Sequence, residues 1–168
     1  LGGVDRPTSG KVYINGTDIF AMNDDELAIF RRRQVGIIYQ FYNLIPILNE
    51  EENMAIPMEL DGRKVEKAQM DDMLLRLGLT ERRTHLPNEL SGGQQQRTSI
   101  GRALITRPSI VLADEPTGNL DTKASNEIMH LLKTSNRELN QTIIMITHNM
   151  ELAKAADRTI MIEDGKIR

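Results

Sequence analysis

The chain has 168 residues, enough for one domain with a substantial core, and it contains 39% apolar and 27% charged residues, as ordinary globular proteins do. A net charge of −3 argues against non-specific binding of nucleic acid, and the absence of cysteine excludes a disulfide framework and a thiolate metal site. No apolar run approaches the roughly 20 residues that a helix needs to span a bilayer, so we expect any membrane role to depend on a partner.

The first part of the chain is expected to hold two strands and one helix. A turn in 1–10 leads to an alternating strand over 11–15, a helix over 24–33 with acidic residues at its start, and a buried strand over 35–39. The buried strand delivers Gln40 to its end. An amide there can accept a hydrogen bond from a metal-bound water and donate one to a phosphate. An ordinary polar residue where a strand meets a loop is the alternative interpretation.

The middle of the chain is expected to be helical. Asn49 is a candidate N-cap for a helix that begins with three glutamates, and Pro57 limits or kinks that helix. Apolar spacing predicts a second helix over 63–77, which Gly78 ends. His85 is interpreted as a surface residue, because no second residue of a metal-binding type stands at a suitable spacing.

A serine and two glycines precede the next predicted helix, over 94–104. Gly92 and Gly93 have no Cβ, so a ligand can approach their backbone closely, and the Ser91 hydroxyl stands beside them. The backbone N–H groups at a helix start are unpaired and carry the positive end of the dipole. The pattern therefore favours an anion site, most plausibly for a phosphate, although Ser-Gly-Gly before a helix is also an ordinary loop and cap.

Two adjacent carboxylates follow the most apolar strand, predicted over 109–113. Asp114 and Glu115 stand at its C-terminal end, where open α/β sheets gather their ligands. Two neighbouring carboxylates are costly unless they meet a cation or a proton. An acidic pair that caps the next helix is the alternative, and Pro116 makes it unattractive.

The last part of the chain is expected to hold a helix and two strands. The helix begins at or near Thr122, and His130 within it is expected to be exposed. A second buried strand, over 142–147, ends at His148, whose ring can donate a hydrogen bond to a phosphate oxygen. A final strand is expected over 158–163.

The order of these motifs resembles that of the ATP-binding-cassette (ABC) ATPases over nearly the whole chain. Leu-Ser-Gly-Gly-Gln at 90–94 matches the family's signature motif, and the apolar strand that leads to Asp114, Glu115 and Pro116 matches its Walker B motif. The resemblance implies an α/β fold of the P-loop NTPase type, with a mainly parallel sheet. It implies a partial ABC ATPase domain at 1–168, with a small helical subdomain at 41–90.

The resemblance also assigns roles around one nucleotide, with ATP and Mg²⁺ as cofactors. Asp114 would hold Mg²⁺, with Gln40 of the Q-loop as a further metal and catalytic residue. Glu115 would orient and polarise the attacking water, and His148 would be the switch histidine that contacts the phosphate.

A second set of residues would serve the nucleotide of the opposite subunit, because ABC domains work as head-to-tail dimers. This set consists of Ser91, Gly92, Gly93 and Gln94 in the signature motif. Asp121, in the match to the family's D-loop, is a further expected cofactor-binding residue. One subunit would therefore hold halves of two ATP sites.

The resemblance implies an ATP-hydrolysing subunit of a transporter, bound to a transmembrane permease at the cytoplasmic face of the cell membrane. Membrane contact would be only through the permease, and no nucleic acid is expected. The segments 42–46, 94–96 and 112–121 resemble the lipoprotein-release, macrolide-export and antimicrobial-peptide-resistance branch. The transported substrate is not encoded in this subunit. A soluble ABC-type ATPase acting on DNA or ribosomes, or a catalytically dead truncated fragment, are the alternatives.

No Gly-x-x-x-x-Gly-Lys-Ser/Thr phosphate-binding loop occurs in the 168 residues. The expectation from the resemblance is a chain truncated before residue 1, which alone binds ATP poorly and hydrolyses it negligibly. The strand of the missing loop is expected beside the Asp114 strand, so that its loss exposes an apolar edge that favours aggregation.

Overall fold

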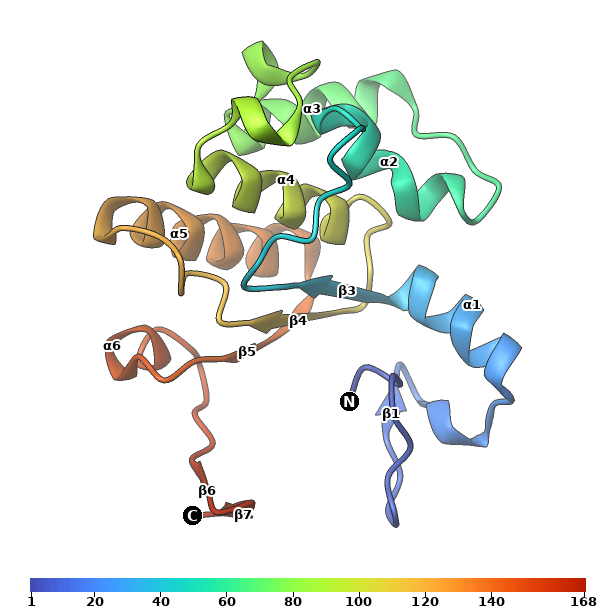
Figure 1. Ribbon diagram of the computed structural model, residues 1–168. Helices are drawn as coiled ribbons and strands as arrows, with labels where there is room; N and C mark the ends of the chain where they lie inside the picture. Colours follow the sequence, from blue (N-terminus) through green and yellow to red (C-terminus); the bar gives the residue numbers. More distant parts are fainter.

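The computed structural model describes residues 1–168 and is built around a parallel sheet of three strands (Figure 1). The strands are β3 (Val35–Ile38), β4 (Ile110–Asp114) and β5 (Thr142–Ile146), in the order β3-β4-β5. The mainly parallel sheet predicted from the sequence is confirmed. The expectation of a further strand beside β4 was wrong, because β4 hydrogen-bonds to β3 along one edge and to β5 along the other.

Helices α4 (Gly92–Leu104) and α5 (Thr122–Leu139) cover one face of this sheet (Figure 1). Alternate β4 residues point to opposite faces, so Val111 and Ala113 join the larger core cluster while Ile110 joins a smaller one. The larger cluster also takes buried side chains from α4, α5 and the helices beyond them: Met54, Leu74, Ile100, Leu104, Ile128 and Leu132.

The opposite face is covered by the N-terminal part of the chain. This part comprises the two-stranded ribbon of β1 (Tyr13–Ile14) and β2 (Thr17–Asp18), the short helix η1 (Ile19–Ala21) and α1 (Asp24–Gln34). The strand expected over 11–15 has only two ladder residues, since the chain turns back at once. Helix α1 begins as predicted, with Asn23 and Glu26 closing a capping box.

Only helices occur between β3 and α4. They are α2 (Glu50–Glu59), α3 (Lys67–Leu77), η2 (Thr80–Arg82) and η3 (Pro87–Glu89). Asn49 and Glu52 cap α2 reciprocally, and the helix continues through Pro57 for two residues before it ends. Helix α3 starts at Lys67 and not at 63, while Gly78 ends it in the left-handed conformation, with φ 66°.

The C-terminal part contains α6 (Met150–Ala153) and a ribbon of β6 (Ile162–Glu163) and β7 (Lys166–Ile167). The strand expected over 158–163 is therefore reduced to its last two residues. None of the helices combines the length and the apolar character that crossing a bilayer requires.

Candidate functional site

Four predicted residues lie together at one end of the sheet, where the three parallel strands have their carboxyl ends. The register pairs Ile38 with Ala113 and Asp114 with Ile146. Gln40, Asp114, Glu115 and His148 all lie within two residues of these strand ends. The predicted grouping of these four residues thus follows from the parallel pairing alone. Their predicted catalytic and metal-binding roles stay predictions.

Glu115 and His148 are in direct polar contact at this end of the sheet. Glu115 Oε1 accepts hydrogen bonds from the His148 backbone N–H at 2.8 Å and from His148 Nδ1 at 2.6 Å. Glu115 Oε2 accepts from the Thr147 hydroxyl at 3.3 Å. Because an ionised carboxylate can only accept, Nδ1 carries the proton of this contact. The His148 side chain is 85% exposed, whereas that of Glu115 is 18% exposed.

These contacts set the protonation of Glu115. Partial burial raises the pKa of this carboxyl, but the hydrogen bonds from His148 and Thr147 lower it by more, and the net pKa lies below the ordinary value. The backbone of Glu115 is in the left-handed region, with φ 43°, which is uncommon for a residue with a side chain. Glu115 is therefore ionised at neutral pH and held at a sharp turn, with its N–H bonded to Ile146 O at 3.0 Å.

Asp114 is exposed and forms no hydrogen bond or ion pair through its carboxylate. No group of three or more His, Cys, Asp and Glu residues that could hold a metal ion occurs in the structure. Mg²⁺ usually takes one or two protein oxygens and completes its shell with water and phosphate. A free carboxylate at Asp114, at the same end of the sheet as Gln40, fits that donor set.

Gln40 is held by the loop that follows Glu115. A Cβ added to Gly118 would come within 2.8 Å of Gln40 Nε2, so the amide lies directly on this glycine. Asn119 Nδ2 donates to Gln40 O at 2.9 Å. The backbone carbonyls of Tyr42 and Asn43, both residues with positive φ, accept from the Arg102 guanidinium of α4. The segment after Gln40 is therefore tied both to the loop after β4 and to α4.

The start of α4 holds the second set of predicted residues. Ser91 is its N-cap: Ser91 Oγ accepts from Gln94 N at 3.3 Å, and Gln94 Oε1 accepts from Ser91 N at 2.9 Å. The N–H groups of Gly92 and Gly93 have no protein partner. A Cβ on Gly92 would come within 2.9 Å of Tyr42 Oη, so the glycine allows this close approach. Capping and anion binding are compatible here, because the cap leaves these two N–H groups free.

The segment around Asp121 borders the start of α4, because a Cβ added to Gly92 would lie 3.8 Å from Leu120 Cδ2 and one added to Gly93 would lie 3.5 Å from Ala124 Cβ. Asp121 itself has a local structural role. It is the N-cap of α5, and its Oδ1 accepts from Ala124 N at 2.8 Å. His130 is exposed, as predicted, and His85 is a surface residue whose Nε2 lies 3.0 Å from Arg82 Nη1. The cofactor-binding role of Asp121 stays a prediction.

Sequence reasoning missed Gln96 and Arg102, two α4 residues that bond to the loops at the sheet edge. Gln96 is fully buried, and its Nε2 donates to Pro116 O at 2.7 Å. A signal was present, because Gln96 precedes Ile100 by four residues and so lies on the apolar face of the predicted helix.

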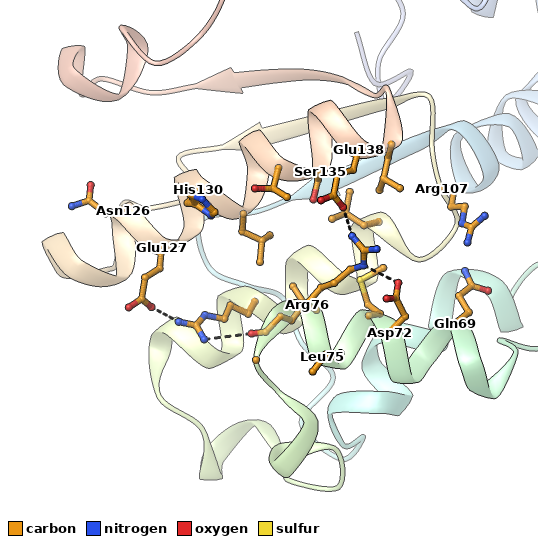
Figure 2. Close-up of a pocket in the computed structure, with 18 residues that line it drawn as sticks. Gln69, Asp72, Leu75, Arg76, Arg107, Asn126, Glu127, His130, Ser135 and Glu138 are labelled. Carbon is orange, nitrogen blue, oxygen red and sulfur yellow. Dashed lines mark hydrogen bonds and ion pairs between the residues drawn. The ribbon is translucent and has the colours of Figure 1, made fainter.

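A cavity of about 710 Å³ lies elsewhere, between α3 and α5 (Figure 2). Two ion pairs join its walls, one from Arg76 to Glu138, which Figure 2 shows, and one from Arg97 to Glu127. None of the predicted site residues lines it. The candidate site is therefore the carboxyl-terminal end of the parallel sheet together with the start of α4, and not this cavity.

Comparison with known proteins shows the family of the chain. Residues 1–118 match the family model described as ABC transporter. The lipoprotein-releasing system ATP-binding protein LolD 1 of Chlorobium chlorochromatii is 43% identical over 99% of this chain and 69% of its own length. The ABC transporter ATP-binding protein YtrE of Bacillus subtilis is 45% identical over the whole chain and 74% of its own length. A solved dimer of the ATP-binding cassette MJ0796, bound to ADP and Pi, superposes with a TM-score of 0.87 at 39% identity, covering 99% of this chain and 74% of the cassette.

Proposed function

Because this chain belongs to the ABC transporter family of ATP-binding proteins, and so is an ABC-type ATPase subunit, we propose that Glu115 is its catalytic base. The observation that carries the proposal is the pairing of Glu115 with His148 beside the free carboxylate of Asp114. An ionised carboxylate with a fixed orientation can accept a proton from an attacking water. Such a base contributes about 10²–10⁴-fold to a rate.

The neighbouring residues have complementary roles in this proposal. Asp114 and the amide oxygen of Gln40 would hold Mg²⁺, which when bound would supply positive charge against the phosphates. His148 fixes the Glu115 carboxylate through Nδ1–H, and its Nε2 can donate to a phosphate oxygen when the ring carries a second proton. The carboxylate pair at 114 and 115 then meets a cation, which removes the mutual repulsion expected from the sequence.

We further propose that ATP is bound between two copies of the chain. Ser91, Gly92, Gly93 and Gln94 of one copy face the nucleotide held at the sheet edge of the other copy, together with Asp121. The free N–H groups of Gly92 and Gly93 at the start of α4 support this role. The dimeric arrangement of the similar MJ0796 cassette supports it as well.

The permease contact is proposed on the helical segment 41–90, which acts as a subdomain. Several large apolar side chains here are exposed, with Phe41 at 72% and Ile47 at 82%. An apolar surface next to the segment that carries Gln40 is suited to a membrane partner. The chain then lies at the cytoplasmic face of the membrane and contacts it only through the permease. Lipoprotein release, as in the LolD relatives, is the proposed transport class.

The proposal is tested in a form of the protein that carries a Gly-x-x-x-x-Gly-Lys-Ser loop ahead of Leu1, called the extended form here. Glu115→Gln keeps the shape of the side chain but removes the base, so turnover should fall by about 10²-fold or more. ATP binding should persist, and an ATP-bound dimer should accumulate in gel filtration.

Glu59→Gln is the matched control, because Glu59 is an exposed carboxylate in the helical segment. It should leave turnover and oligomeric state unchanged. Wild-type turnover in Glu115→Gln would remove Glu115 from the mechanism, and a Glu115→Gln protein that stays monomeric with saturating ATP would contradict the shared site.

A further inference from the structure

Gln96 makes the one hydrogen bond that holds the peptide after Glu115. Its side chain is fully buried on α4, and Nε2 donates to Pro116 O at 2.7 Å. Pro116 is itself buried and accepts no other hydrogen bond. The other end of the Gln96 amide, Oε1, is buried without a partner. A buried amide that satisfies only one of its ends is a costly side chain to keep for packing alone.

The Glu115 side chain is held by three hydrogen bonds from Thr147 and His148, but the backbone that follows it has little other support. Glu115 has φ 43°, and a side chain in this region persists only where its surroundings fix it. The turn is anchored before Glu115 by the bond from its N–H to Ile146 O, and it is closed by the bond from Gly118 N to Glu115 O, each 3.0 Å long. Between these two anchors, Pro116 lacks an N–H, so Gln96 supplies the only bond to the rest of the protein.

We propose that Gln96 is a positioning residue for Glu115, which fixes the Glu115 turn to α4. Gln96 lies five residues after Ser91 on one continuous helix. The start of α4 is proposed to contact the nucleotide held by the other copy of the chain, while Glu115 acts on the nucleotide held by its own copy. Through Gln96, a movement of the start of α4 is passed to the Glu115 carboxylate. This inference rests on the proposed role of Glu115 and adds the residue that keeps it in place.

The chain contains a matched control in Gln141. Its side chain is 4% exposed, Nε2 donates to Pro108 O at 2.8 Å, and Oε1 is buried without a partner. The chemistry equals that of Gln96, but Pro108 precedes β4 whereas Pro116 follows it. If both glutamines had only a structural role, replacing either one should have the same effect on turnover and on the exchange of the Gly118 amide.

The first measurement is amide hydrogen exchange in the extended form without nucleotide, with Gln96→Met and Gln141→Met side by side. Met keeps the length of the side chain and loses the donor. The Gly118 amide should exchange about five- to tenfold faster in Gln96→Met, the factor expected for one lost hydrogen bond, and should be unchanged in Gln141→Met. The urea midpoints of the two variants should shift by similar amounts.

The second measurement is ATP turnover. In Gln96→Met, kcat should fall about tenfold to a hundredfold with KM little changed, because small displacements of a catalytic group are costly. Gln96→Glu should recover turnover as the pH falls, since the protonated acid can again donate to Pro116 O while the carboxylate cannot. Gln141→Met should turn over like the wild type.

The inference is overturned if Gln96→Met and Gln141→Met have the same kcat and the same Gly118 exchange. It is also overturned if the loss of turnover in Gln96→Met is matched by a loss of global stability that Gln141→Met does not share. If Glu115→Gln turns over normally, the proposed function fails, whatever the exchange data show. If Glu115→Gln is inactive and Gln96→Met is fully active, only the positioning role fails.

Discussion

Two glutamates in different regions of the molecule have opposite pKa shifts. Glu115, at the end of β4, accepts three hydrogen bonds, and its pKa lies below the ordinary value. Glu50, at the start of α2, is 1% exposed and accepts one, from Thr98 Oγ1 at 2.6 Å. Burial raises the pKa of Glu50 to about 7, although the Thr98 bond lowers it in part. In Glu50 burial outweighs a single donor, whereas in the less buried Glu115 three hydrogen bonds outweigh burial.

The Thr98 hydroxyl cannot serve all its neighbours at once. It lies 2.6 Å from Glu50 Oε2 and 3.0 Å from Gln94 O, yet it has a single proton to donate. An ionised Glu50 takes that proton, while a protonated Glu50 can itself donate to Thr98 and leave the hydroxyl free for Gln94 O. The polar chain behind the start of α4 is therefore complete only when Glu50 is protonated.

Replacing Glu50 with Gln should have the largest effect on stability in this comparison. The native state binds a proton that the unfolded state has lost between pH 4.5 and about 7, so the free energy of unfolding of the wild type falls as pH rises through this interval. The full interval corresponds to about 3 kcal/mol. Glu50→Gln should abolish this fall and be more stable than the wild type at pH 8, as measured by urea unfolding at pH 5 to 8. Glu59→Gln is the control, and an unchanged pH dependence in Glu50→Gln would contradict the burial argument.

Removing the single donor to Glu50 should have an intermediate effect. Thr98→Val keeps the volume and leaves a buried carboxylate without a partner, which costs about 1–3 kcal/mol when Glu50 is ionised. The pKa of Glu50 should rise, because the Thr98 bond lowers it. Urea unfolding should show the cost at pH 8 and little of it at pH 5. An equal cost at both pH values would mean that Thr98 contributes through packing instead.

Removing one of the three donors to Glu115 should have the smallest effect. His148→Ala takes away the ring contact, and burial should then raise the pKa of Glu115, which carboxyl NMR can follow. The stability lost should be about 1 kcal/mol, since the ring is largely exposed and water competes for the bond. Because the folded pKa is depressed, this contribution is present above about pH 4.5 and disappears as the pH falls through the folded pKa. A Glu115 pKa unchanged by the mutation would show that Thr147 and the backbone suffice.

Much of the site followed from the sequence because it depends on strand ends. The buried strands were recognisable as apolar runs, and parallel pairing places Gln40, Asp114 and His148 at one edge without further information. The capping of α4 by Ser91 was likewise readable from local spacing.

The contacts between elements were not readable in the same way. The bonds from Arg102 to the carbonyls of Tyr42 and Asn43 join residues about 60 positions apart, and no local pattern marks a backbone acceptor. The three glutamates at the start of α2 suited the helix dipole equally, and only packing against α4 buries Glu50 rather than its neighbours. The start of α3 was placed too early because Glu66, its N-cap, makes no capping bond that a sequence pattern could reveal.

The order of the strands has a consequence for the folding of this chain. Next to the pairing of β4 with β5, Gln141 bonds to Pro108, and these residues are 33 positions apart. Next to the pairing of β3 with β4, Ser109 bonds to Gln34, and these residues are 75 positions apart. Closing the longer loop costs about 0.7 kcal/mol more chain entropy if both loops are flexible. Non-local pairing of this kind slows the search for the native topology. Helix formation in 50–89 shortens the effective loop, so the helical segment lowers the entropic barrier to docking the strand that precedes it.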